Sequence, residues 1–212
     1  MKNLSTKIKE RYELSAVQHM TDFNNLESIL KNKKIFSKNS VESENIEVED
    51  ISNKSVQRGR AETIIDCTNK PLHDYVPLYW GKKTPMVSIL RDRYDTLIFL
   101  MFSTNLLIDN DCVVCDGNAR DEGSEFTEYK DIDDLDCLDA TSINTVKYRN
   151  VPEIKRCKQA ELLVQNELSL DHLAYIVCFS NRVKTKIQQL LATHCINCRV
   201  YVGRSNYYYL DS

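Results

Sequence analysis

The longest apolar run in the chain, TLIFLMF at residues 96–102, limits what the sequence can fold into. A helix that spans a bilayer needs about 20 consecutive apolar residues, so this run predicts no membrane-spanning segment. A short run of this kind is typical of a strand that is buried on both faces. We therefore expect a globular core with such strands at its centre.

Length and composition predict a single domain over residues 1–212. Of the 212 residues, 42% are apolar and 28% are charged, and no Pro/Gly/Ser-rich linker divides the chain. These values are ordinary for a soluble domain with one core. The first residues, MKNLSTKIKERYEL, are too polar for a secretory signal peptide, so we expect a cytoplasmic protein with no membrane association.

Eight cysteines raise the question of disulfides or a metal site. Without an export signal, reduced thiols are expected rather than a disulfide framework. Two C-x-x-C pairs, Cys112–Cys115 and Cys195–Cys198, have the form of a four-thiolate zinc site, but neither lies in a glycine-rich knuckle. Since both pairs lie in β-branched apolar stretches, we expect small buried side chains on strands and no metal.

The order of the predicted elements favours a mixed α+β fold. Regular alternation of strand and helix is missing, which argues against a doubly wound sheet. Residues 37–50 are polar and acidic and are expected to form a mobile surface segment, and residues 118–154 a long polar excursion with a helix near 131–138. The expected helices cover residues 23–34 (capped by Thr21 or Asp22), 49–65 (capped by Asp50 or Ser52), a short stretch from Pro85, and 180–194 (capped by Ser180 or Asn181), and the expected strands cover 73–80, 95–102, 111–117, 160–165, 172–179 and 199–203.

Charge and motifs exclude several classes of function. The net charge of −3 means that binding to nucleic acid would need a local basic patch. The sequence contains no G-x-G-x-x-G, G-x-x-x-x-G-K-[ST], H-E-x-x-H or G-x-S-x-G motif. Rossmann, P-loop, zincin and esterase functions therefore lack their main sequence support.

Three polar residues at the ends of predicted elements are candidates for a site. Glu161 lies at the start of the apolar strand AELLVQ, where a core position would not normally hold an acid, although a surface glutamate paired with Lys158 is an alternative. His19 precedes a helix start and could face a polar ligand, or it could cap the helix or lie satisfied in the core. Arg60 could be a solvated helix residue. Spacing alone does not decide between these interpretations.

Four stretches of the chain carry a recognisable pattern: HMTDFNNLESIL, VQRGRAE, HDYVPLYWGKKTPM, and DGNA followed by KQAELLV. The most specific parts are Y-V-P-x-Y-x-x-x-x-x-P-M and K-Q-A-E-x-L-V. With these stretches in this order, the chain resembles the DarT family of bacterial toxins, enzymes that transfer ADP-ribose from NAD onto bases of DNA.

The resemblance implies an ADP-ribosyltransferase-like fold, which is α+β with a mixed, split central β-sheet flanked by helices. It implies Glu161 and Arg60 as catalytic residues, residues 43–62 as the element that folds over NAD, and residues 116–161 as the loop that presents the target base. The implied NAD-binding residues are His19, Met20, Thr21, Asn25, Ser28 and Arg60. The implied nucleic-acid-binding residues are Tyr75, Tyr79, Trp80, Lys82, Lys83 and Met86.

The implied chemistry explains an acid at the start of a buried strand. When the bond between nicotinamide and ribose breaks, positive charge develops on the sugar, and a fixed carboxylate at Glu161 would stabilise it without a metal. A base nitrogen is reachable only when the base is unstacked, which favours single-stranded DNA as the acceptor.

We therefore expect a toxin that transfers ADP-ribose from NAD to single-stranded DNA, with thymine favoured over guanine. The expected partner is an antitoxin, of macrodomain type or another hydrolase, that removes the ADP-ribosyl group. Two other functions remain open: a transferase that acts on RNA or protein, and a non-catalytic single-strand-binding module on the same fold.

Overall fold

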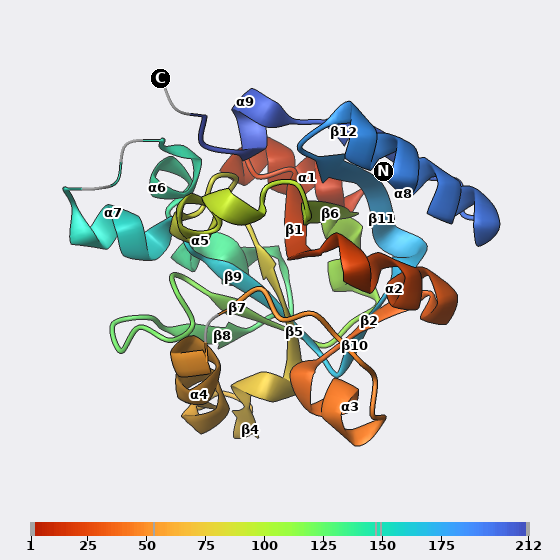
Figure 1. Cartoon of the computed structure of the whole chain (residues 1–212). Coiled ribbons are helices and arrows are strands. Elements are labelled where there is room, and N and C mark those ends of the chain that lie inside the picture. The colour runs from red at the N-terminus through yellow and green to blue at the C-terminus, as the bar shows by residue number, and fades with distance from the viewer. Residues whose placement is uncertain (1–2, 53, 147, 149, 211–212) are drawn as a thin grey trace.

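The structure is a computed structural model that describes residues 3–52, 54–146, 148 and 150–210. Within these residues, eight strands form one central sheet: β1 (Ala16–Asp22), β5 (Tyr75–Tyr79), β6 (Leu97–Ser103), β7 (Cys112–Cys115), β8 (Phe126–Glu128), β9 (Glu161–Gln165), β11 (Leu173–Cys178) and β12 (Arg199–Val202). Their order across the sheet is β12-β11-β6-β1-β5-β9-β7-β8 (Figure 1). The β11–β12 pair is parallel and the other pairs are antiparallel, so the sheet is mixed.

Helices and two small sheets surround the central sheet. One small sheet pairs β2 (Lys34–Phe36) with β10 (Glu167–Ser169), and the other pairs β3 (Ile64–Ile65) with β4 (Lys70–Pro71). The α-helices are α1 (Leu4–Tyr12), α2 (Leu26–Asn32), α3 (Lys38–Ser43), α4 (Lys54–Glu62), α5 (Pro85–Ile89), α6 (Ala140–Asn144), α7 (Pro152–Cys157), α8 (Asn181–Thr193) and α9 (Arg204–Tyr207). The short 3-10 helices are η1 (Phe23–Asn25), η2 (Leu72–Asp74), η3 (Arg91–Arg93), η4 (Thr104–Ile108), η5 (Ile132–Cys137) and η6 (Leu170–His172). In Figure 1, α3 and α4 lie at the lower edge of the view, and α8 and α9 lie at the upper edge.

Strand β6 is covered on both faces, which explains its unbroken apolar sequence. Its odd-numbered side chains from Leu97 to Met101 pack in one core cluster, and its even-numbered side chains from Ile98 to Phe102 pack in another. Burial of a large apolar side chain stabilises the fold by about 1.5–3 kcal/mol, so β6 contributes strongly to the core. The predicted buried strand at 95–102 is confirmed. No helix among the described residues is both long and apolar enough to cross a membrane.

The central sheet is split between β1 and β5. Strand β1 pairs with β6 along its whole length, from Ala16↔Ser103 to Asp22↔Leu97. It pairs with β5 at the single position Gln18↔Tyr79. Ladder hydrogen bonds hold neighbouring strands at a fixed spacing. Since β1 and β5 share a ladder at this one pair alone, the two strands can separate beyond it. The predicted α+β fold with a mixed, split sheet is confirmed.

Local sequence signals identified most elements that follow a capping residue or a proline. Asp22 caps η1, because its side chain accepts a hydrogen bond from the Asn24 backbone N–H at 2.9 Å. Ser180 caps α8 in the same way through Val183. Pro85 lies at the first position of α5. These predicted helix starts are confirmed.

Two stretches differ from the sequence predictions. A mobile surface segment was expected over residues 37–50, but residues 38–43 form α3 with Ser37 as its N-cap. Strand β1 was not predicted, because its sequence AVQHMTD does not alternate between apolar and polar side chains as a half-buried strand does. Tertiary contacts therefore contribute to the secondary structure of both stretches.

The two cysteine pairs have different environments. Cys112 and Cys115 are buried on β7, as predicted. Cys195 is exposed, and Cys198 is partly exposed, in the connection between α8 and β12, so the prediction of buried strand positions is wrong for this pair. Cys195 has a φ of 54°, which belongs to a left-handed turn and not to a strand.

Lys158 is buried at the junction between α7 and β9 and is 1% exposed. Its Nζ donates to the backbone carbonyls of Ile143, at 3.2 Å, and of Thr145 at the end of α6. These contacts satisfy carbonyls that the last turn of a helix leaves without intrahelical donors. Burial, together with repulsion from Lys83, lowers the pKa of Lys158 to about 8.

Replacement of Lys158 by Met should therefore change how stability depends on pH. In the unfolded chain the pKa of this lysine is 10.5, so between about pH 8 and 10.5 the unfolded state holds a proton that the native state has released. Native stability then rises with pH through this window. We expect the unfolding free energy of the wild type, minus that of Lys158→Met, to increase from pH 8 upwards in urea denaturation. A difference that stays flat over this range would contradict the prediction.

Candidate active site

Glu161 begins β9 and lies in the middle of the sheet. Its neighbours across the strands are Tyr79 on β5 and Cys115 on β7. Directly paired residues project to the same face, so these three side chains form a row. Glu161 is 1% exposed. A carboxylate buried to this extent needs a cation and hydrogen-bond donors to remain charged.

Arg60 supplies the cation. It lies in the last turn of α4, and its Nη1 donates to Glu161 Oε1 at 3.2 Å while its Nη2 donates to Oε2 at 3.1 Å. Such a two-point contact fixes the orientation of both side chains. The Arg60 side chain is 13% exposed. The alternatives of a surface Glu161 paired with Lys158 and of a solvated Arg60 are therefore wrong.

A further donor to Glu161 comes from the loop after β7. The backbone N–H of Ala119 donates to Glu161 Oε1 at 3.1 Å. Arg156 holds this loop, because its Nη1 donates to Asp116 Oδ1 at 2.8 Å. Gly117 leaves room for that contact, since a Cβ at this position would lie 2.6 Å from Arg156 Nη1. Arg156 thus positions the loop whose backbone contacts Glu161.

The groups around Glu161 keep their protons. Burial, and then the Glu161 carboxylate, raises the pKa of Tyr79 and of Cys115 well above their usual ranges. Burial alone would lower the pKa of Arg60, but the attraction of Glu161 outweighs it and the pKa is raised. The row therefore contains one anion in contact with one cation, flanked by neutral polar groups.

A cavity of about 220 Å³ lies beside this pair, and Arg60 forms part of its wall. Side chains from the end of β1, from α2 and from α4 contribute to the lining. The six residues predicted to bind NAD all belong to it: His19, Met20, Thr21, Asn25, Ser28 and Arg60. The structure thus brings the predicted cofactor set together in one place. Arg60 is the member that contacts Glu161, which does not itself line this cavity.

Two histidines in the cavity wall are neutral near neutral pH. His19 Nδ1 lies 3.1 Å from the Pro77 carbonyl oxygen, across the split in the sheet, and burial lowers the pKa of His19. A donor at Nδ1 leaves Nε2 of the neutral ring as an acceptor. Burial, and then the nearby Arg60, lowers the pKa of His73. Within the described residues, His73 Nε2 is buried without a hydrogen-bond partner, which leaves it available to a ligand.

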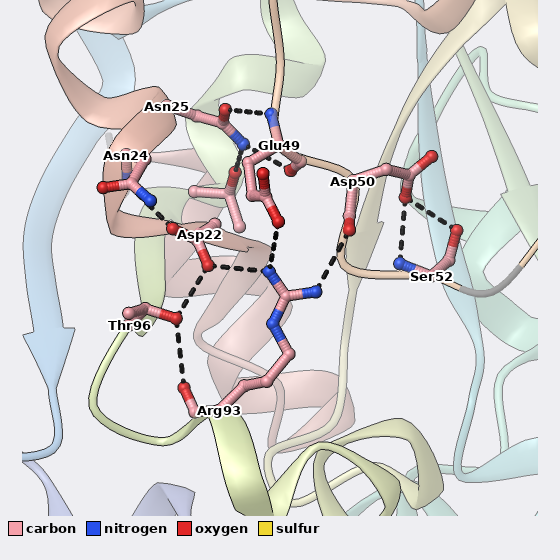
Figure 2. A network of polar contacts seen from close by, with 9 residues as sticks. Asp22, Asn24, Asn25, Glu49, Asp50, Ser52, Arg93 and Thr96 are labelled. Carbon is pink, nitrogen blue, oxygen red and sulfur yellow. Dashed lines mark hydrogen bonds and ion pairs between the residues drawn. The ribbon is translucent and has the colours of Figure 1, made fainter.

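Residues 45–52, which we call the strap, contribute to another side of the cavity. Asn25 holds the backbone of Glu49 in both directions: Nδ2 donates to its carbonyl at 2.9 Å, and Oδ1 accepts from its N–H at 2.7 Å (Figure 2). Asn25 Nδ2 also donates to Thr21 Oγ1 at 3.0 Å. The second half of the stretch predicted to be a mobile surface segment therefore packs against the cavity.

The residues predicted to bind nucleic acid separate into three places. Three line the same cavity as the NAD set: Tyr75, Tyr79 and Met86. Two lie in the surface turn before α5: Lys82 and Lys83. Trp80 is 4% exposed and packs in the core, so the prediction that its ring stacks on a base is wrong. The reason is the alternation of β5, which directs Val76, Leu78 and Trp80 to the core face.

Sequence analysis missed several residues that shape this site. His73 and Gln57 line the cavity, and Asp22 and Arg93 anchor the strap. His73 could have been found, because it opens the stretch HDYVP that carries the family pattern. Arg93 carried no such signal, since it contacts residues 44 and 71 positions away in the chain.

The chain matches one family model, described as "ssDNA thymidine ADP-ribosyltransferase, DarT", over residues 18–209. No curated protein sequence matches the chain.

Solved structures share its fold. DarT of Thermus sp. 2.9 in complex with ADP-ribosylated ssDNA is 22% identical with a TM-score of 0.84, and the match covers 92% of this chain and 97% of that one. The same protein in complex with NAD+ is 22% identical with a TM-score of 0.79, over 92% and 98% of the two chains. DarTG of Thermosipho africanus in complex with ADP-ribose is 19% identical with a TM-score of 0.77, over 90% of this chain and 50% of that one.

The Arg60–Glu161 pair predicts an asymmetry in stability. Arg60→Met would leave a carboxylate buried without its cation, which typically reduces the free energy of unfolding by about 3–5 kcal/mol. Glu161→Gln should reduce it by less, about 1–3 kcal/mol, because Arg60 borders the cavity and can be solvated there. Urea denaturation of both variants at neutral pH measures the two losses, and equal losses would contradict this description of the pair.

Proposed function

Because this chain belongs to the DarT family of ssDNA thymidine ADP-ribosyltransferases, we propose that Glu161 and Arg60 are its catalytic residues and that the cavity beside them binds NAD. Residues 1–212 would form one transferase domain, since the strands of its sheet run from β1 to β12 of the chain. The observation that carries the proposal is the buried carboxylate of Glu161, held by Arg60 and by the Ala119 N–H next to the cavity.

The cavity wall has the chemistry that a dinucleotide needs. Apolar side chains such as Ile29 and Val56 can pack against a flat base, and hydroxyl and amide groups such as Ser28 and Gln57 can bind a ribose. His73 Nε2, which has no partner among the described residues, is a free polar group in this wall. Arg60 supplies positive charge where the donor carries anionic phosphates.

NAD as the co-substrate supplies the ADP-ribosyl group. The bond from ribose C1′ to the nicotinamide nitrogen breaks with its electron pair going to nicotinamide, which leaves as a neutral molecule. A bond from C1′ to a thymine nitrogen forms, and the proton of that nitrogen is released to water. Glu161 stabilises the positive charge that develops on the ribose and can accept a hydrogen bond from its 2′-hydroxyl. A strand in the middle of a sheet holds the carboxylate more firmly than a loop would.

Arg60 has two tasks in this proposal. Its contact with Glu161 keeps the carboxylate charged and oriented. Its position at the cavity wall lets the guanidinium shift towards the donor or the incoming base. Tyr79, which stays protonated beside Glu161, can donate a hydrogen bond without competing for the negative charge.

A cationic and aromatic surface next to the cavity is the proposed path of the DNA strand. The Lys82 ammonium lies 5.1 Å from the Tyr207 ring centroid, and the Lys83 ammonium lies 5.6 Å from that of Tyr209. The Arg91 guanidinium lies 6.0 Å from the same Tyr209 ring. Cations can bind phosphates, and the partly exposed Tyr209 ring can support an unstacked base, whereas Tyr207 is buried in the core.

The expected antitoxin remains part of the proposal. The matched region makes up 50% of the Thermosipho africanus DarTG chain, so that protein contains as much sequence again beside the part that this chain resembles. We infer that an ADP-ribosyl hydrolase, of macrodomain type or another, acts with this enzyme in the cytoplasm, where it would meet DNA.

Glu161→Gln should abolish most transfer but keep NAD binding. Loss of one preorganised electrostatic contact typically lowers kcat by about 10²–10³-fold. The measurement is mass spectrometry of a thymine-containing oligonucleotide after incubation with NAD, with NAD affinity measured by calorimetry. Glu62→Gln, an exposed position on the same helix as Arg60, is the matched control and should transfer ADP-ribose like the wild type. Wild-type rates for Glu161→Gln would falsify its catalytic role, and transfer to RNA or protein in place of DNA would favour the alternative acceptors.

Replacement of Lys82 and Lys83 by Met should weaken binding of single-stranded DNA and reduce its salt dependence. Each lost phosphate contact should lower the slope of log K against log salt by about 0.7. Lys7 and Lys9, exposed on α1, offer a control pair with the same loss of charge. Fluorescence anisotropy at several salt concentrations measures the slopes, and equal slopes for the two double variants would remove Lys82 and Lys83 from the interface.

A further inference from the structure

Arg93 joins three parts of the chain with one guanidinium group. Its Nη2 donates to Asp22 Oδ2 at 2.9 Å and to Glu49 Oε1 at 3.0 Å, and its Nη1 donates to the Asp50 carbonyl at 3.1 Å (Figure 2). Asp22 ends β1, whereas Glu49 and Asp50 belong to the strap. Arg93 therefore ties the strap to the strand that carries the first cavity residues, although it does not itself belong to the described cavity wall.

The Asp22 end of this connection is firmly held. The Asp22 side chain is 2% exposed, and its Oδ2 also accepts a hydrogen bond from Thr96 Oγ1 at 2.7 Å. Its Oδ1 accepts from the Asn24 N–H at 2.9 Å. A buried carboxylate with a cation and two further donors makes strong, charge-assisted contacts. Asp22 can therefore serve as a fixed anchor for the strap through Arg93.

The strap itself is acidic, which makes such an anchor necessary. It contains Glu47, Glu49 and Asp50, and it borders a cavity proposed to take a donor with two anionic phosphates. Arg93 offsets the charge of Glu49, and Lys38 Nζ lies 3.7 Å from Asp50 Oδ2. Without these cations, like charges would push the strap away from an anionic ligand.

We propose that Arg93 is a positioning residue for the transfer reaction, which latches the strap over the cavity and thereby sets the affinity for NAD. Asn25 shares this role, because hydrogen bonds of its side-chain amide join Thr21 at the end of β1 to the backbone of Glu49 in the strap. The inference rests on the proposed function of the cavity. It extends that function to Arg93 and Asp22, which lie outside the lining of the cavity.

The test compares three variants. Arg93→Met combined with Asp22→Asn removes the guanidinium without leaving a buried charge unpaired, and Asn still caps η1 well. Glu49→Gln removes one ion pair and keeps the backbone contacts to Asn25. Arg199→Met, exposed on the edge strand β12, is the control. Thermal unfolding of each variant establishes that it folds.

Two readouts are independent of each other. The first readout is the pair of kinetic constants, KM for NAD and kcat, measured together with the Kd for NAD by calorimetry. The second is the rate at which a glutamate-specific protease cleaves after Glu47 and Glu49, since cleavage requires the strap to open locally. The expected result for the double variant is a KM and Kd raised about tenfold with kcat within about twofold, and faster cleavage that saturating NAD slows. Glu49→Gln lacks the cleavage site at position 49, so its cleavage is compared with that of the wild type after Glu47 alone. The rate of that cleavage should rise by about twofold to fivefold, less than in the double variant.

Each other outcome overturns the inference in a specific way. Unchanged cleavage in the double variant would mean that Arg93 does not hold the strap. Faster cleavage with unchanged Kd for NAD would mean that the strap does not set the affinity. A lower kcat with unchanged KM would assign Arg93 to a different step. If the wild type binds NAD but transfers nothing to DNA, the proposed function fails, whereas Kd and cleavage still decide the role of Arg93.

Discussion

The contact between Arg60 and Glu161 is the interaction on which the rest of this site depends. A carboxylate in the middle of a sheet, 1% exposed, keeps its charge because a guanidinium and a backbone N–H satisfy it. The same contact ties β9 to α4, which is far from it in the sequence and forms part of the cavity wall. One ion pair thus has two effects: it fixes the orientation of a buried carboxylate, and it positions the helix that forms part of the cavity wall.

The split in the sheet lies at the cavity, where His19 of β1 and Pro77 of β5 both belong to the wall. Strands β1 and β5 share one residue pair, Gln18↔Tyr79, and Tyr79 belongs to the row that contains Glu161. Full pairing between them would close the opening. The stability of this region therefore comes from β6, which pairs with all of β1 and is buried on both faces. Because β6 holds β1 along its whole length, β1 can end in polar residues, some of which line the cavity.

The polar network around Asp22 adds a third level of organisation. Asp22 terminates β1, caps η1 and binds Arg93, so one side chain connects the sheet, the cavity and the strap (Figure 2). Arg93 and Asn25 hold the strap from outside and from inside the cavity wall. Arg93 thus holds the strap without lining the cavity, whereas Asn25 both lines the cavity and holds the strap. Their contacts are nevertheless continuous from Thr96 through Arg93 to Glu49.

The sequence by itself determined the class of fold, the positions of most helices and strands, and, through the family pattern, the side chains that meet at one cavity. It could do so because burial on a regular element repeats at a fixed spacing, and capping residues mark where helices begin. The tertiary structure alone decided that β1 is a strand, that Trp80 lies in the core, and that Glu161 pairs with Arg60 instead of Lys158. These outcomes depend on which strands become neighbours in the sheet. Strand order is a property of the whole chain, since it places Tyr79 and Cys115 on either side of Glu161. The position of α4 then brings Arg60 to the same carboxylate from 101 positions away.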